Sequence, residues 1–251
     1  MDCAFSLLAR EGLLHISGPD SLTFLQGQTT CDTRDVSTSR AVPGVYCTPK
    51  GRTVADFLLV AMAEEHFVLR MRQDIVPNAA TVLGKYIVFS KAELDPANDT
   101  WQVAACWGSD AASTLAGIFR LVQMDDAGTL FECYLRSDCD LTTQLASACH
   151  AGEAGDWEAA QIAAGIARIE SATVEEFIPQ MLNYDLTGFI SFTKGCYTGQ
   201  EVVARLHYRG KPKRRSYAGT IEAGAAPAPG TPLFTSGEGQ SVDNIVNACT
   251  D

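Results

Sequence analysis

The sequence predicts an α+β fold with mostly antiparallel sheets. Two apolar segments, 54–62 and 67–71, are joined through the polar residues Glu64-Glu65-His66, an arrangement typical of a β-hairpin. The other strand and helix candidates interleave without the regular alternation of a doubly wound parallel sheet. With 251 residues, of which 46% are hydrophobic and 20% charged, the chain has the composition of an ordinary globular protein with a sizeable core.

Each expected element has a local reason. The strands are apolar runs bounded by turn residues, and they cover 13–18, 41–47, 54–62, 67–71, 101–107 and 129–136. Most of the expected helices begin beside a polar capping residue or carry a proline in the first turn. One helix is expected to begin at 19–21, and the others cover 74–86, 109–119, 141–150 and 156–166. Thr173 and Glu176 have the spacing of a further capping box.

The segment Lys-Gly-Cys-Tyr-Thr-Gly-Gln-Glu at 194–201 is the most informative part of the chain. Thr198 and Glu201 stand three apart, as in a capping box, and an apolar stripe follows up to Gly210, so we expect a helix here. Cys196 would lie about two residues before its positive end, where a thiol pKa falls, and Lys194 would add to this if its ammonium turns inward. A small apolar side chain that fills a turn is the other interpretation of Cys196.

The chemistry of Cys196 is left open between a nucleophile, a ligand of iron or of a shared cluster, and a redox thiol. His207 stands too far along the same expected helix to serve as its base. The nine cysteines include no C-x-x-C pair, so we expect reduced thiols in a cytoplasmic protein and no stable metal site. No apolar run is long enough to cross a membrane, and the N-terminus does not resemble a secretory signal.

The charge is uneven along the chain. The net charge of −11 argues against general binding of nucleic acid. The segment 205–215, however, holds six Lys or Arg residues and no acid. Such a cluster is either a solvated face or a site for an anionic ligand, such as a glutamate tail or a phosphate backbone.

The segment 194–201 and others resemble the YgfZ-type folate-binding proteins, which are relatives of the glycine-cleavage T-protein (aminomethyltransferase). The resemblance extends over roughly residues 13 to 215. Its further segments are Leu25-Gln26-Gly27-Gln28-Thr29-Thr30-Cys31-Asp32, Lys85-Tyr86-Ile87-Val88-Phe89-Ser90-Lys91, Gly165-Ile166-Ala167-Arg168-Ile169, Glu176-Phe177-Ile178-Pro179-Gln180, Asn183-Tyr184-Asp185, Gly188-Phe189-Ile190-Ser191-Phe192, Val202-Val203-Ala204-Arg205, Tyr208-Arg209-Gly210 and Lys213-Arg214. A motif with Lys, Cys, two Gly, Gln and Glu in fixed order is highly specific.

The resemblance implies a T-protein-like domain organisation. We expect a folate-binding α+β domain at 1–210 and a C-terminal β-barrel segment at 211–251. The barrel would hold strands near 213–221, 231–236 and 241–248 and would be incomplete, since the relatives continue for several strands.

The resemblance also implies a function. We expect a monomeric, tetrahydrofolate-binding accessory protein, rather than a classical enzyme, that supports assembly or repair of iron–sulfur enzymes and thereby tRNA modification. Its implied partners are folate, iron–sulfur assembly or client proteins, and tRNA through the basic segment 205–215. The alternative is a tetrahydrofolate-dependent one-carbon (aminomethyl) transferase. T-proteins carry adjacent acids on a strand where this chain has only Asp56, which argues against the transferase.

The implied site residues form two groups. Cys196 and Lys194 are the candidates for catalysis. The candidates for folate binding either correspond to polar or aromatic positions of the family or would form a basic rim of the pocket. They are Trp157, Glu176, Gln180, Asn183, Gln200 and Arg205. Glu11 stands where the family tends to carry a second aromatic residue, so that wall of the pocket is in doubt.

Overall fold

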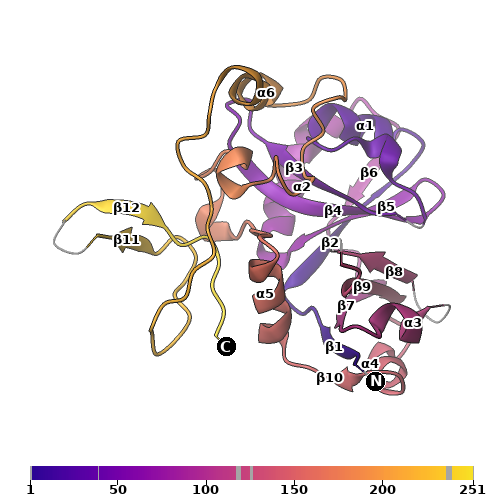
Figure 1. Cartoon of the computed structure of the whole chain (residues 1–251). Helices are drawn as coiled ribbons and strands as arrows, with labels where there is room; N and C mark the ends of the chain where they lie inside the picture. The colour runs from indigo at the N-terminus through magenta and orange to yellow at the C-terminus, as the bar shows by residue number, and fades with distance from the viewer. Residues whose placement is uncertain (1, 39, 117–119, 125–126, 236–238, 251) are drawn as a thin grey trace.

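Two five-stranded sheets form the body of the protein (Figure 1). The computed structural model describes residues 2–38, 40–116, 120–124, 127–235 and 239–250. The first sheet is antiparallel and contains, in spatial order, β3 (Val42–Cys47), β4 (Thr53–Ala63), β5 (His66–Arg72), β2 (Glu11–Ser17) and β6 (Glu93–Asp95). The second contains β10 (His150–Ala151), β1 (Ala4–Leu7), β7 (Trp101–Trp107), β9 (Leu130–Arg136) and β8 (Arg120–Gln123), and only β1 and β10 pair in parallel.

The helices cover the outer faces of these sheets. The helices are α1 (Ser21–Gln28), α2 (Val76–Ile87), α3 (Ala111–Leu115), α4 (Leu141–Ala146), α5 (Ala154–Ala163) and α6 (Gln200–Arg209), and short 3-10 turns cover Thr33–Asp35, Gln73–Ile75, Ser171–Thr173 and Pro179–Leu182. Side chains of α1 and α2 pack with the first sheet, and those of α3 and α4 with the second. A third apolar cluster lies between the sheets and includes Trp157 of α5.

The strand β4 shows why these layers form. Leu58, Val60 and Met62 belong to the cluster between the sheets, whereas Phe57 and Leu59 both belong to the cluster that packs with α1 and α2. Successive side chains of a strand point to opposite faces, so a strand covered on both faces must be apolar almost throughout. The run of apolar residues at 54–62 is therefore explained by its position as a central strand that is covered on both faces.

The six expected strands are confirmed, and β1, β6, β8 and β10 were missed. The helix expected at 109–119 is limited to Ala111–Leu115, with 117–119 outside the described residues. The helix at 141–150 ends at Ala146, because His150 pairs with β1. Glu153, not Asp156, is the first capping residue of α5.

Two further expectations were wrong. The capping box near 173 is made by Glu170 and Thr173, not by Thr173 and Glu176. Cys3, just before β1, and Cys149, just before β10, form a disulfide, so the chain is not fully reduced, and the other seven cysteines form no disulfide among the described residues. No spacing pattern indicated this bond, because the two cysteines stand 146 positions apart along the chain.

The C-terminal segment forms only part of the expected β-structure. The strands β11 (Pro232–Phe234) and β12 (Ser241–Asn244) pair with each other, residues 213–221 form no strand, and position 236 lies outside the described residues. The described residues therefore show a hairpin and no closed barrel. Among them, no helix combines the length and the apolar character that crossing a bilayer requires.

The histidine pair on β2 and β5 predicts a loss of stability in mild acid. His15 is buried, and its Nδ1 lies 2.8 Å from Nε2 of His66. Burial and then the neighbouring His66 lower the pKa of His15 from 6.5 to about 4, although Asp95 opposes the shift. The unfolded chain therefore binds more protons than the folded chain between these two values, and the free energy of unfolding falls as the pH drops through that window.

We expect urea unfolding to show a decrease of about 1–3 kcal/mol between about pH 6.5 and about pH 4.5. His15→Gln should remove most of this decrease, whereas the exposed control His150→Gln should retain it. An unchanged pH dependence in His15→Gln would contradict the assignment.

Candidate functional site

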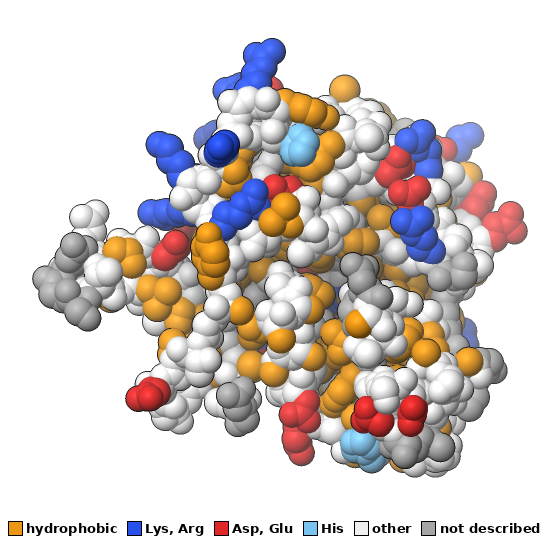
Figure 2. Space-filling model, viewed as in Figure 1, with side chains coloured by type: hydrophobic (Ala, Val, Ile, Leu, Met, Phe, Trp, Pro, Cys, Tyr) orange, Lys and Arg blue, Asp and Glu red, His pale blue; other side chains and the backbone are white. Residues whose placement is uncertain are grey.

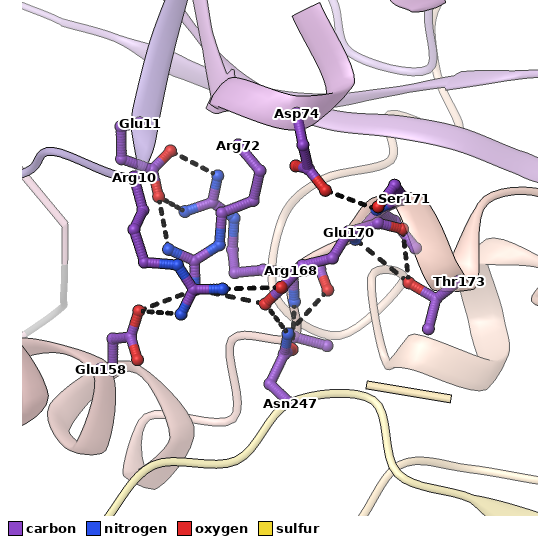
Figure 3. Close-up of polar contacts among 12 residues, drawn as sticks. Arg10, Glu11, Arg72, Asp74, Glu158, Arg168, Glu170, Ser171, Thr173 and Asn247 are labelled. Carbon is purple, nitrogen blue, oxygen red and sulfur yellow. Dashed lines mark hydrogen bonds and ion pairs between the residues drawn. The ribbon is translucent and has the colours of Figure 1, made fainter. Parts of the chain in front are cut away.

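A buried cluster of arginines and carboxylates lies where the two sheets meet the segment after α5 (Figure 3). Glu11, at the start of β2, is its centre, with a side chain only 2% exposed. Arg168 donates to both carboxylate oxygens of Glu11 at 3.0 and 2.9 Å. Arg72 donates to Oε1 at 3.0 Å, and Arg70 donates to Oε2 at 3.2 Å. One carboxylate thus holds three arginines from two separate parts of the chain.

Two further carboxylates pair with Arg168 and Arg70. The Nε of Arg168 donates to Asp56 at 2.6 Å, and the backbone N–H of Ile169 donates to the other oxygen of Asp56, also at 2.6 Å. Arg70 reaches across to the second sheet, where its Nε donates to Glu132 at 3.0 Å. Both oxygens of Asp56 are therefore occupied by groups of the protein itself.

The charge of Glu11 is fixed by its neighbours. Burial by itself raises the pKa of Glu11, but Arg168, Arg70 and Arg72 outweigh this effect and hold the pKa at about 2. The carboxylate is consequently ionised at neutral pH. Where the resemblance implied a second aromatic residue, this protein places a buried charge that is paired with three arginines.

A small cavity lies beside α5, between the arginine cluster and the C-terminal tail. Its volume of about 10 Å³ is close to that of one water molecule. Arg72, Gln161 and Arg168 line one side, and Asn247 and Ala248 of the tail line the other. The tail thus forms a wall of the cavity.

Asn247 binds this region through its side-chain amide. Its Oδ1 accepts the backbone N–H of Arg168 at 2.7 Å, and its Nδ2 donates to the carbonyl oxygen of Arg168 at 3.0 Å. The same Nδ2 donates to Oε1 of Glu170 at 3.1 Å (Figure 3). The backbone N–H and carbonyl of Arg168 and the carboxylate of Glu170 therefore match a planar group that carries a carbonyl beside an N–H.

Three buried donors near α5 lack a hydrogen-bond partner among the described residues: Nε1 of Trp157, Nε2 of Gln161 and Nε of Arg72. Trp157 and Gln161 are one turn apart on α5, and Trp157 is only 2% exposed and packs against Trp107. Gln161 and Arg72 both line the cavity, and buried donors are nearly always paired, so their unpaired groups indicate a place where water or a ligand binds.

The segment 194–201 lies at the other end of the first sheet. Lys194 is buried, and its Nζ donates to the carbonyl oxygens of Gln26 and Thr29 at 2.6 Å and of Cys31 at 2.8 Å. Burial lowers the pKa of Lys194 to about 8, which leaves it mostly charged at neutral pH. The ammonium therefore holds the end of α1, and its expected role beside the Cys196 thiolate stays a prediction.

The expected capping box at the start of α6 is absent. The helix begins at Gln200 after Gly199, which has a left-handed φ of 84° and serves as the N-cap. A Cβ at Gly199 would stand 2.6 Å from the carbonyl oxygen of Thr48, so only glycine fits. Thr198 instead donates to Gln28 at 3.1 Å, and Glu201 forms an ion pair with Arg205. Cys196 is exposed and lies further from the helix start than expected.

The other expected folate contacts gather near α6 and not near Trp157. The buried Gln180 donates to the carbonyl of Val203 at 2.7 Å, Gln200 donates to the carbonyl of Gly195 at 3.2 Å, and the left-handed Asn183 donates to the carbonyl of Ser216 at 2.8 Å. Glu176 and Arg205 are exposed. Among the described residues, none of their hydrogen bonds reaches Trp157 or the cavity beside α5.

Several residues of the cavity and of the contacts of Asn247 were not among the sequence candidates, namely Arg72, Gln161, Glu170 and Asn247. One signal was present in the sequence: Arg70 and Arg72 alternate within an otherwise apolar strand, which places two charges on one buried face. Gln161 and Asn247 had no such signal, because their roles depend on which distant segment packs on them.

The three hydrogen bonds that Lys194 donates to backbone carbonyls predict that this side chain stabilises the folded protein. Lys194→Met leaves three backbone carbonyls at the end of α1 without a donor, and we expect a loss of about 3 kcal/mol in the free energy of unfolding measured with urea. Lys85→Met, at an exposed position near the end of α2, should change it by less than about 0.5 kcal/mol. Similar losses of unfolding free energy in both variants would show that the hydrogen bonds of Lys194 contribute little to stability.

Comparison with known proteins places this architecture in a family. Residues 8–158 match the family model described as the GCVT N-terminal domain. A tRNA-modifying protein YgfZ of Yersinia pestis (strain Pestoides F) is 34% identical over 239 residues, covering 88% of this chain and 72% of that protein. An uncharacterised protein of Haemophilus influenzae is also 34% identical, over 214 residues that cover 85% of this chain and 72% of its own length.

A solved structure supports the same placement at the level of the fold. The glycine cleavage system aminomethyltransferase T of Bartonella henselae superposes with a TM-score of 0.67 at 14% identity, covering 83% of this chain. This chain spans 64% of that protein's length. The fold, the family match and the similarity to YgfZ agree, and the chain therefore belongs to the YgfZ-type branch of the glycine-cleavage T-protein family.

Proposed function

We propose that this protein binds a tetrahydrofolate-type ligand beside α5. The observation that carries the proposal is the group of buried donors without partners on Trp157, Gln161 and Arg72. A folate is flat and rich in hydrogen-bonding groups at one end and anionic at the other. An aromatic ring, an amide and an arginine are suited to such a ligand.

The contacts of Asn247 support this location. Its amide satisfies the carbonyl and N–H of Arg168 together with the carboxylate of Glu170. A pteridine ring carries the same pairing of carbonyl and N–H along one edge and could replace the amide there. The present cavity holds about one water molecule, so binding requires the segment around Asn247 and Ala248 to move away from α5.

We further propose that the protein acts as an accessory factor that supports assembly or repair of iron–sulfur enzymes, and thereby tRNA modification. The similarity to proteins named tRNA-modifying protein YgfZ supports this role. The exposed Cys196 is available to a partner, either for a shared cluster ligand or for thiol chemistry.

The alternative of an aminomethyl transferase is less well supported. Such a reaction would need a carboxylate free to act on the transferred group. Asp56 is buried, and its two oxygens already accept bonds from Arg168 and Ile169. An assay for formaldehyde-equivalent transfer tests this alternative, and turnover that is lost in Asp56→Asn while the variant remains folded would favour it.

Calorimetric titration with tetrahydrofolate and its methylene and formyl derivatives tests the ligand. We expect binding by the full chain and an approximately ten-fold loss in Gln161→Leu, which removes a hydrogen bond to the ligand. The same variant should keep or raise thermal stability, because the unliganded protein loses an unpaired buried donor.

Trp157→Phe keeps most of the core volume and should weaken binding as well, whereas Trp157→Ala risks unfolding the core. Gln144→Leu, at an exposed position on α4, should bind as the original chain does. The absence of binding for every folate form would contradict the proposal, and so would full affinity in both Gln161→Leu and Trp157→Phe.

Cys196→Ser tests the accessory role separately. We expect this variant to bind tetrahydrofolate with unchanged affinity, because the thiol lies outside the α5 region, and to fail in restoring iron–sulfur enzyme activity to cells that lack the protein. Cys139→Ser is the matched control and should restore activity. Full restoration by Cys196→Ser would remove the thiol from the mechanism.

A further inference from the structure

One face of the protein combines free positive charge with exposed aromatic rings. Within the segment 205–215, Arg205 is paired with Glu201, and Arg215 is paired with Asp185. The remaining four cations are exposed and form no ion pair with a described carboxylate: Arg209, Lys211, Lys213 and Arg214. Figure 2 shows Lys and Arg side chains gathered over α6 and the segment that follows it.

The fold adds two cations to this segment that the sequence places far away. The turn between β3 and β4 packs directly on α6, because a Cβ at Gly51 would stand 2.7 Å from Cβ of Val202. The exposed Lys50 and Arg52 flank Gly51, so they lie beside the helix. We call these six side chains, from 50, 52, 209, 211, 213 and 214, the α6 basic surface.

An aromatic group lies within this surface. The ring of His207 stacks on Phe192 with centroids 3.6 Å apart and planes tilted by 12°. Tyr208 stands edge-on to both rings and is 67% exposed. Its hydroxyl donates to the carbonyl of Phe192 at 3.3 Å, which fixes the orientation of the ring. The exposed ring is thus held in place before any partner arrives.

We propose that the α6 basic surface binds RNA at an unpaired loop, with phosphates on the cations and a base stacked on Tyr208. Positively charged side chains combined with exposed aromatic rings are the means by which proteins bind single-stranded nucleic acid. An acidic peptide would use the charges but would gain little from a fixed aromatic ring. The accessory role proposed above needs no direct RNA contact, so this interaction is an addition to it.

The charge of the rest of the molecule favours a single orientation. The net charge is −11, and the segment 205–215 alone contributes +6, so the remainder carries −17. The polyanion is therefore attracted to this face and repelled elsewhere. Such an arrangement gives one-sided binding that weakens strongly as the salt concentration rises.

Fluorescence anisotropy with a labelled, unmodified tRNA anticodon stem–loop tests the proposal. We expect salt-dependent binding by the full chain. The double reversal Arg209→Glu with Lys213→Glu should abolish it, whereas Lys85→Glu with Lys91→Glu, the same charge change outside the surface, should leave most of it. Tyr208→Ala should weaken binding about ten-fold, and Tyr208→Phe should have a much smaller effect because the ring remains.

Comparison with a DNA duplex of the same length separates stacking from charge alone. We expect the duplex to bind more weakly than the stem–loop and to be insensitive to Tyr208→Ala. Equal binding of duplex and stem–loop, an unchanged affinity in Tyr208→Ala, or no RNA binding at about 0.05 M salt would each overturn the proposal. A surface that holds a folate polyglutamate but no RNA would overturn it as well. Folate titration of the same variants reports on the α5 region independently.

Discussion

The buried carboxylate of Glu11 is the interaction on which the arrangement of this protein most depends. It binds Arg70 and Arg72 from β5 and Arg168 from the segment after α5. Removing charges from water is costly, and the cost is offset only when every charge is paired with good geometry. Loss of any one partner would leave uncompensated charge in the interior. The cluster therefore fixes the position of the segment 166–170 relative to both sheets.

That segment in turn organises the region proposed to bind folate. Arg168 presents its backbone N–H and carbonyl to Asn247, and Glu170 adds a carboxylate to the same edge. Because Arg168 is held on its other side by Glu11 and Asp56, this edge is fixed before any ligand arrives, and the tail covers it through the amide of Asn247. A fixed recognition edge lowers the cost of ordering the protein when a ligand binds.

The segment 194–201, which carries Cys196, is held in place by contacts other than those of the arginine cluster. Lys194 binds three backbone carbonyls at the end of α1, and the left-handed Gly199 allows the chain to approach the turn before β4. Together they hold α6 against the first sheet and leave Cys196 exposed. The ligand region and the surface around α6 are thus built from different contacts. The two regions can accordingly serve different partners, one small and one macromolecular.

The sequence by itself determined the fold class, most strands and the family, because apolar periodicity and a dense local motif are properties of neighbouring residues. It also singled out Cys196 and the basic segment as candidates, because neither pattern needs a distant contact to be recognised. The tertiary structure alone decided that Lys194 faces carbonyls, that Glu11 is a buried anion, and that Lys50 and Arg52 lie beside α6. Each of these depends on segments that are remote along the chain and meet only when the sheets pack. Burial and pairing of charge are set by that packing, and no local pattern encodes them.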